Sequence, residues 1–124
     1  MANTSTQGTP IALTLGDPFG GSKAIPIRVN YDTPLADLTL YAPDKQSRAY
    51  VVGLTEVTEA DHVLTLKSGS ATIAAPSFGA FSGLHHPFCV AAPSILVETE
   101  PGAALVMNCN RTLQPFTLYV VEAL

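Results

Sequence analysis

Prolines and glycines interrupt this chain so regularly that a long helix has no place to form. Ten prolines and nine glycines are spread through 124 residues, and no window of about 12 residues both avoids them and carries an apolar stripe of helical period. From Pro10 onward, short runs of alternating character are separated by turn residues roughly every 8 to 12 positions, which is typical of a sandwich or barrel. The sequence therefore predicts an all-β protein with little or no helix.

The candidate strands are segments with β-rich composition or period-two alternation. The last of them is apolar on both faces, since Phe116, Leu118 and Val120 alternate with Thr117, Tyr119 and Val121. Such a strand is expected to be central in a sheet or covered by another subunit. The predicted strands are residues 11–15, 25–31, 37–41, 49–57, 62–67, 71–75, 94–100, 103–109 and 116–122.

Three connections carry turn chemistry, namely residues 42–45 (Ala-Pro-Asp-Lys), 67–70 (Lys-Ser-Gly-Ser) and 100–103 (Glu-Pro-Gly-Ala). The last two predict antiparallel hairpins over 62–75 and 94–109, whereas 17–22 and 76–87 are expected to be longer loops. The economical architectures are an antiparallel sandwich or jelly roll and a small Greek-key barrel.

The chain has the length of one domain. Residues 1–9 are polar and show no periodicity, so they are predicted to form a flexible N-terminal arm, and residues 10–124 a single β domain. Met1–Pro10 has neither the basic region nor the apolar core of a secretory signal, so we expect no signal peptide.

Composition and charge limit the kinds of partner that this chain is expected to bind. Hydrophobic residues make up 47% and charged residues 13%, the formal net charge is −4, and the six basic residues are scattered singly. A chain without clustered cations is not expected to bind nucleic acid or an anionic membrane, and its apolar runs are too short to cross a bilayer. So few charges predict apolar surface that a partner covers.

No catalytic set can be assembled from the sequence. His85, His86 and Cys89 form the most suggestive cluster, but adjacent histidines on an extended chain point to opposite sides, and no His-x-His motif is present. The glycine-rich segment 16–23 lacks the order of a phosphate-binding loop, and no serine lies in a nucleophile elbow. We therefore predict no enzyme, no metal and no cofactor; a metalloenzyme that also uses His62 ranks last.

Cys89 and Cys109 are predicted to be free, buried thiols in a reducing compartment, with a disulfide as the alternative. Glu98 and Glu100 project from one face of a predicted strand. They are read as its solvated side, and the alternative is a site for calcium or sugar, to which the four tyrosines would contribute.

An uncharged aromatic segment is the least explained part of the sequence. Residues 74–88 carry three phenylalanines and no charge, so this loop is either a lid on the core or an interface anchor. Together with the arm, it supplies the predicted partner-binding residues: Asn3, Thr4, Thr6, Phe78, Phe81, Leu84, His85 and Phe88.

The polar arm of residues 1–9, the small-residue strands Ala71-Thr-Ile-Ala-Ala-Pro76 and Ala103-Ala-Leu-Val-Met-Asn108, and the strand-like C-terminus are together similar to the decoration, or cement, proteins of tailed-phage capsids. This resemblance implies a β-sandwich or β-tulip-like domain that forms a trimer or dimer and bridges neighbouring subunits of the major capsid protein. It also implies a structural protein on the capsid surface of the virion, made in the host cytoplasm. The alternative is a small non-catalytic module that binds a carbohydrate or another ligand.

Overall fold

The structure is a computed structural model that describes residues 3–13, 23–57, 64–74, 84–86, 88–90 and 93–124. Within these residues every regular element is a strand and every strand pair is antiparallel, which confirms the predicted all-β class. The strands are β1 (Thr4–Gln7), β2 (Ile11–Ala12), β3 (Lys23–Tyr31), β4 (Leu38–Tyr41), β5 (Arg48–Val57), β6 (Leu64–Ser68), β7 (Ala71–Ala74), β8 (Leu84–His86), β9 (Val97–Glu98), β10 (Leu105–Cys109) and β11 (Leu113–Ala123).

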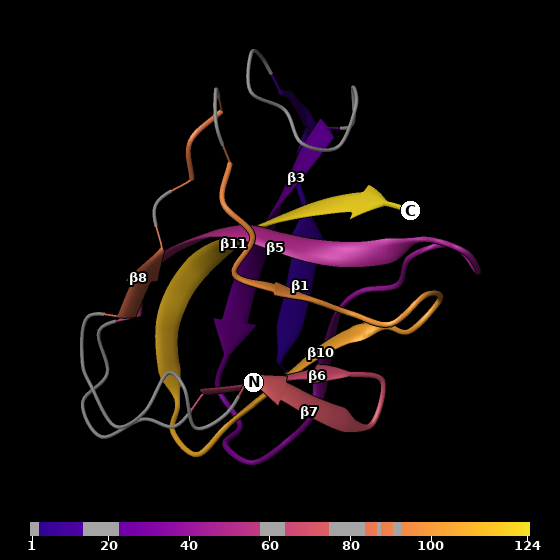
Figure 1. The fold of residues 1–124 in the computed structure, drawn as a ribbon. Helices are drawn as coiled ribbons and strands as arrows, with labels where there is room; N and C mark the ends of the chain where they lie inside the picture. The colour runs from indigo at the N-terminus through magenta and orange to yellow at the C-terminus, as the bar shows by residue number, and fades with distance from the viewer. Residues whose placement is uncertain (1–2, 14–22, 58–63, 75–83, 87, 91–92) are drawn as a thin grey trace.

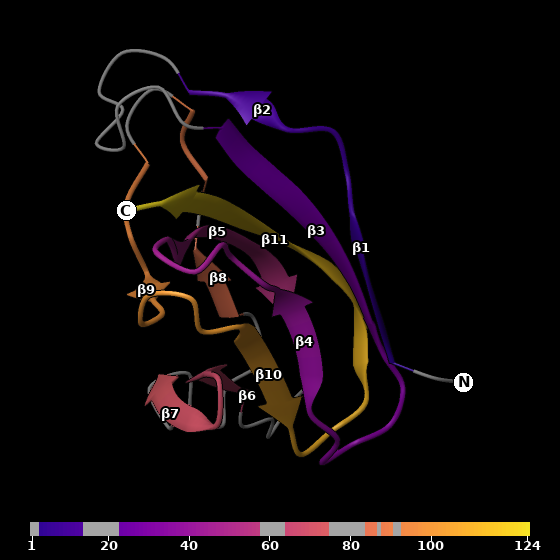
Figure 2. The same cartoon turned by 90° about the vertical axis from the view of Figure 1, so that its right-hand side faces the viewer.

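Two sheets pack face to face as a sandwich (Figures 1 and 2). The larger sheet has the order β1-β3-β11-β5-β8, with β2 also paired to β3 and β9 also paired to β5. The smaller sheet has the order β4-β10-β6-β7. β11 lies between β3 and β5, as its two apolar faces predicted.

The chain crosses repeatedly between the sheets, and β6–β7 is the tight hairpin within the described residues. This confirms the hairpin predicted over 62–75. The hairpin predicted over 94–109 is wrong, because β9 pairs with β5 in the larger sheet whereas β10 pairs with β4 and β6 in the smaller one. The turn itself forms: Ala103 N donates to Glu100 O at 3.0 Å, and Gly102 has a φ of 74°. It directs the chain from one sheet to the other.

Of the other two predicted turns, one forms where it was predicted and one is displaced along the chain. Gly69 has a φ of 61° in the β6–β7 turn, as its sequence requires. The turn predicted at 42–45 lies further along, where Ser47 N donates to Asp44 O at 2.9 Å. Gly102 also fits closely here, since a Cβ on it would lie 2.7 Å from Lys45 O. The two turns therefore pack together, and only glycine fits at this position.

The main core lies between the sheets. In β3, Ile27, Val29 and Tyr31 are buried and alternate with more exposed residues, the period-two pattern of a strand with one face inward. Phe116, Leu118 and Val120 of β11 meet them from the neighbouring strand, and the smaller sheet contributes its own buried side chains. The latter are Leu40, Leu64, Leu66, Leu105, Met107 and Cys109.

A second apolar cluster lies on the outer face of the larger sheet. Tyr50, Val52 and Val121 alternate with the core residues of their strands and are buried on the opposite face. Ile11 and Leu13 pack on this cluster, as does Phe88. Part of the outer face of the larger sheet is therefore covered too, which explains why several of its strands are apolar on both sides.

Two segments contain strands where none was expected. The arm of residues 1–9 was predicted to hold no element, but Thr4–Gln7 forms β1, which pairs with residues 27–30 of β3. The loop predicted over 76–87 contains β8, which pairs with β5. Both strands lie at rims of the larger sheet, where pairing to an existing strand compensates for weak intrinsic preference.

Candidate functional site

The connection between β3 and β4 holds a leucine in a conformation that leucine rarely adopts. Leu35 has a φ of 65°, in the left-handed region that favours glycine, and the residue is 72% exposed. It follows Pro34 in a turn, at the position where a type II turn normally places glycine or asparagine. A left-handed leucine costs about 1–2 kcal/mol, and burial of its side chain compensates little of this cost.

Backbone contacts on both sides fix this conformation. Leu35 N donates to Cys109 O at 2.7 Å, and Asn108 Nδ2 donates to Leu35 O at 3.2 Å. The end of β10 therefore bonds both the N–H and the C=O of Leu35, which fixes the backbone from which the leucine side chain projects.

A buried tyrosine supports the same turn from inside. The Tyr31 hydroxyl donates to Ala36 O at 2.6 Å and accepts a hydrogen bond from Cys109 N at 3.0 Å. Burial raises the pKa of this hydroxyl, which stays protonated as a donor. The ring is fully buried in the core, so Tyr31 links the Leu35 turn rigidly to the sandwich.

A polar cluster supports the far end of the turn. Asp37 accepts hydrogen bonds from Asn108 Nδ2 at 2.8 Å and from Lys67 Nζ at 3.0 Å. These two donors hold the pKa of Asp37 below its usual value, with the Asn108 bond the larger effect. The second half of the loop is thus bonded to β10 and β6 of the smaller sheet.

Beside the turn lies an open cleft of about 400 Å³, lined by Pro34, Asn110, Arg111, Thr112 and Gln114. Thr112 Oγ1 donates to Asp32 O at 3.1 Å, which joins the two connections that form it. Arg111 is exposed and forms no ion pair with any residue that the structure describes. The cleft therefore offers a guanidinium and several neutral hydrogen-bonding groups beside an exposed apolar side chain.

The N-terminal segment reaches this same end of the sandwich. Asn3 Oδ1 accepts hydrogen bonds from Asp32 N at 2.7 Å and Thr33 N at 2.8 Å, and Asn3 Nδ2 donates to Thr33 O at 3.0 Å. We call residues Asn3, 32–37 and 108–114 the Leu35 pole; its two connections lie at the lower end of the molecule in Figure 2.

The structure places the predicted arm residues in different settings. Asn3 is engaged with the pole, and Thr4 Oγ1 accepts a hydrogen bond from Asn30 Nδ2 at 3.3 Å. Thr6 is exposed on the outer face of the larger sheet, opposite Arg28. The sequence pointed to the arm, but not to the loop that the arm meets.

The predicted aromatic site is described only at its end. Phe78 and Phe81 lie outside the described residues; Leu84 and His85 lie in β8, far along the chain from the Leu35 turn, and only their backbone is described. The Phe88 ring stacks on Tyr119 with centroids 4.5 Å apart and an interplanar angle of 12°. A Cβ on Gly53 would lie 2.5 Å from Phe88 Cβ, so the segment packs directly on the sheet. Phe88 therefore packs on the second apolar cluster, and the choice between lid and interface anchor for the whole segment stays open because residues 75–83 and 87 lie outside the described residues.

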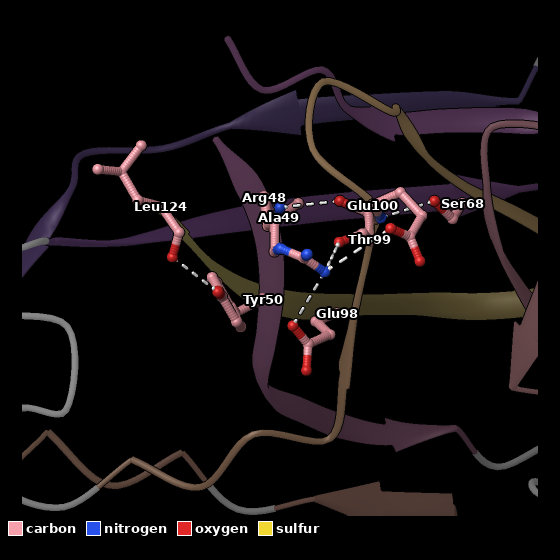
Figure 3. A network of polar contacts seen from close by, with 8 residues as sticks. All are labelled: Arg48, Ala49, Tyr50, Ser68, Glu98, Thr99, Glu100 and Leu124. Atoms are coloured by element: carbon pink, nitrogen blue, oxygen red, sulfur yellow. Dashed lines mark hydrogen bonds and ion pairs between the residues drawn. The ribbon is translucent and has the colours of Figure 1, made fainter. Parts of the chain in front are cut away.

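Glu98 and Glu100 share an arginine that the sequence did not connect with them. Arg48 Nη1 lies 3.4 Å from Glu98 Oε2 and 3.9 Å from Glu100 Oε2 (Figure 3). All three side chains are partly or largely exposed, and such ion pairs contribute about 0–1 kcal/mol. The two carboxylates thus face a cation of their own chain.

Thr99, between the two glutamates, is buried and bonds to β5, and the backbone of Glu100 next to it bonds to the smaller sheet. Thr99 Oγ1 accepts a hydrogen bond from Ala49 N at 2.9 Å, and Thr99 N donates to Ala49 O at 3.0 Å. Glu100 N donates to Ser68 Oγ of the smaller sheet at 2.9 Å (Figure 3). This network is a structural connection between the sheets.

A second connection of this kind joins β4 to β11. The Tyr41 hydroxyl donates to Glu122 Oε1, and Asp44 N donates to Glu122 Oε2 at 3.0 Å. Burial opposes ionisation of Glu122, but these hydrogen bonds outweigh it and the pKa of Glu122 is lowered. Burial first, and then the bond to Glu122, raise the pKa of Tyr41.

The two cysteines are not joined, as predicted, but they differ in burial. Cys109 is buried as expected, whereas Cys89 is exposed, so the prediction of a buried thiol is wrong for Cys89. Among the described residues, no three His, Cys, Asp or Glu side chains gather as metal ligands would; His62 lies outside those residues. The part of the chain that the structure describes contains no helix long and apolar enough to span a bilayer.

Comparison with known proteins identifies no relative: no family model, no curated protein and no solved structure matches this chain.

Proposed function

We propose that this protein is a structural, non-enzymatic subunit that decorates a phage capsid, and that it docks on neighbouring capsid subunits through the Leu35 pole. Its support is the resemblance in composition and strand character to decoration proteins, together with a rigid sandwich that presents an apolar side chain at one end. The major capsid protein is the proposed partner, and the capsid surface is the proposed location.

The observation that carries the docking surface is the conformation of Leu35. Backbone strain is retained where surrounding contacts over-determine it, and such residues cluster at binding sites. Here the strained backbone exposes an apolar side chain to water, which does not stabilise the free protein. Its presentation is explained if a partner buries it.

The surroundings of Leu35 indicate what that partner presents. An apolar pocket would receive the leucine side chain, and a carboxylate or carbonyl group would pair with the Arg111 guanidinium at the adjacent cleft. A folded protein surface offers both within a few residues. Burying the exposed Leu35 side chain contributes about 1–2 kcal/mol.

The test is co-sedimentation of the purified protein with empty shells of the major capsid protein encoded in the same genome. Wild type is expected to bind saturably, and Leu35→Asn about 5- to 30-fold more weakly. Leu124→Asn makes the same change at another exposed leucine and is the matched control, because Leu124 lies at the C-terminus and is 85% exposed.

The outcomes separate the two parts of the proposal. If wild type does not bind the shells, decoration is refuted. If wild type binds and the Leu35 and Leu124 variants bind equally well, the protein decorates the capsid by another surface.

The polar lining of the cleft supports a second candidate, a small module that binds a carbohydrate or similar ligand. Asn110, Thr112 and Gln114 offer neutral donors and acceptors, and Arg111 a charged donor, as sugar hydroxyls require. A glycan array tests this candidate. Specific binding that Arg111→Gln abolishes would support it, and an array without hits would remove it.

A further inference from the structure

Among the strands that the structure describes, β1 ends the larger sheet, no strand pairs with its outer side, and its pairing with β3 is regular. Its four residues pair with β3 without a register shift, from Thr4 opposite Asn30 to Gln7 opposite Ile27. Gly8 N donates to Pro26 O at 2.8 Å. Because backbone bonds alternate along an antiparallel pair, Thr4, Thr6 and Gly8 turn their backbone groups toward β3, and Ser5 and Gln7 turn theirs outward.

Apart from its length of four residues, this edge lacks the features that block strand pairing. Natural edges are protected by charge, proline, bulges or short length. β1 contains no charge or proline, and residues 1–16 contain no charged side chain at all. Figure 2 shows β1 along the rim beside β3, with none of the labelled strands on its other side.

The other edge strands differ from β1. β4, β7 and β8 each pair with a register shift, and β2 and β9 contribute only two residues each. Thr39 O of β4 already accepts a hydrogen bond from Ser5 Oγ at 2.9 Å. That bond also braces β1 against the smaller sheet, so the free edge of β1 is held ready for pairing.

We propose that β1 pairs antiparallel with β1 of a second copy, which joins the two larger sheets into one continuous sheet across a two-fold axis at Thr6. In this register Ser5 lies opposite Gln7 of the second copy, so the outward backbone groups of both residues meet as hydrogen-bonded pairs. Thr6 lies opposite Thr6 of the second copy on the exposed face, and Thr–Thr pairs stabilise antiparallel strands.

The sequence of β1 suits pairing with a second copy, and the hydrogen bonds of Asn3 favour a two-fold axis at Thr6. Thr-Ser-Thr-Gln is uncharged and self-complementary under a two-fold axis, which closes the assembly at two subunits. A two-fold axis at Ser5 would instead require Asn3 to enter the ladder, but the Asn3 side chain is engaged with the β3–β4 connection. The alternative occupant, a strand of a different protein, becomes an outcome of the test.

The experiment measures mass in solution by light scattering and sedimentation, without any capsid, so its result is independent of the proposed function. Wild type is expected at twice the chain mass of 13.0 kDa. Thr6→Lys and Thr6→Glu each place like charges opposite one another and are expected to weaken dimerisation by at least about fivefold. An equimolar mixture of the two is expected to restore the dimer.

The charge-swap design keeps the test interpretable. Thr6 is exposed and its backbone faces β3, so both variants retain the fold, which thermal melting checks. Ser70→Lys, in the exposed β6–β7 turn, is the matched control and is expected to remain dimeric. A monomeric wild type at the highest soluble concentration overturns the proposal, as does an oligomer that neither Thr6 variant weakens; a monomer that gains a foreign strand at β1 would assign the edge to another protein.

Discussion

Replacing Leu35 tests whether this residue stores backbone strain in the free protein. Asparagine adopts the left-handed region far more readily than leucine, whereas alanine keeps the unfavourable Cβ without the rest of the side chain. At a φ of 65°, Leu35→Asn relieves about 1 kcal/mol of strain and Leu35→Ala relieves none.

The packing contribution is small and similar for both variants. Leu35 is 72% exposed, and a fully buried leucine contributes about 1.5–3 kcal/mol, so the covered part contributes roughly 0.4–0.8 kcal/mol. Leu35→Asn should therefore match or slightly exceed the wild-type free energy of unfolding, and Leu35→Ala should fall about 0.5 kcal/mol below it.

The decisive quantity is the difference between the two variants, about 1 kcal/mol, because the packing losses largely cancel. It corresponds to roughly 4 °C in melting temperature for a domain of this size. Urea unfolding followed by circular dichroism, with thermal melting as a check, measures it. If the alanine variant is as stable as the asparagine variant, the reasoning from backbone strain is refuted.

Three further predictions concern other parts of the molecule. Gly53→Ala should lower stability by about 1–3 kcal/mol, because its Cβ meets Phe88 Cβ at the root of the side chain, where rotation of the ring gives no relief; an unchanged unfolding midpoint would show that Phe88 does not pack there. One thiol, that of Cys89, should react rapidly with a thiol reagent in the native protein, and that of Cys109 only on unfolding; two rapid equivalents would contradict the burial of Cys109. The lowered pKa of Glu122 means that its contribution to stability is present above its ordinary value of 4.5 and is lost as the pH falls through the lowered value. Glu122→Gln should accordingly lose less melting temperature on acidification than wild type, and equal losses would refute this assignment.

Turn chemistry and alternation were sufficient to predict the fold class, and insufficient to predict the pairing. Glu100-Pro-Gly-Ala103 was recognised as a turn and forms one, but the period-two pattern of the flanking strands does not say which sheet each strand joins. The bond from Glu100 N to Ser68 Oγ and the packing of the turn against residues 44–47 decide that, and both are long-range contacts.

The candidate site was missed for a similar reason. The sequence predicts Asn3 as part of a polar arm, but its partners at Asp32 and Thr33 lie about thirty residues away, and no local pattern connects them. The one local signal at the pole is Pro34 followed by Leu35, since proline favours the second position of a turn whose third position requires a positive φ. Leucine at that third position contradicts the usual preference, and such conflicts between sequence and conformation are expected at functional sites.

The N-terminal segment connects the two proposed surfaces, and this determines how they must be tested. Asn3 holds the Leu35 pole through three hydrogen bonds, and the next four residues form the β1 edge. Truncation of residues 1–9 would therefore loosen the Leu35 pole and remove the β1 edge together, so loss of capsid binding or of dimerisation would identify neither surface. The charge swap at Thr6 changes the edge and leaves the bonds of Asn3 intact, and Leu35→Asn changes the pole and leaves the β1 backbone intact. If the two surfaces are independent, the Thr6 variants are expected to bind capsid shells as monomers, and the Leu35 variant to remain dimeric; the opposite result for either variant would show that pole and edge act as one surface.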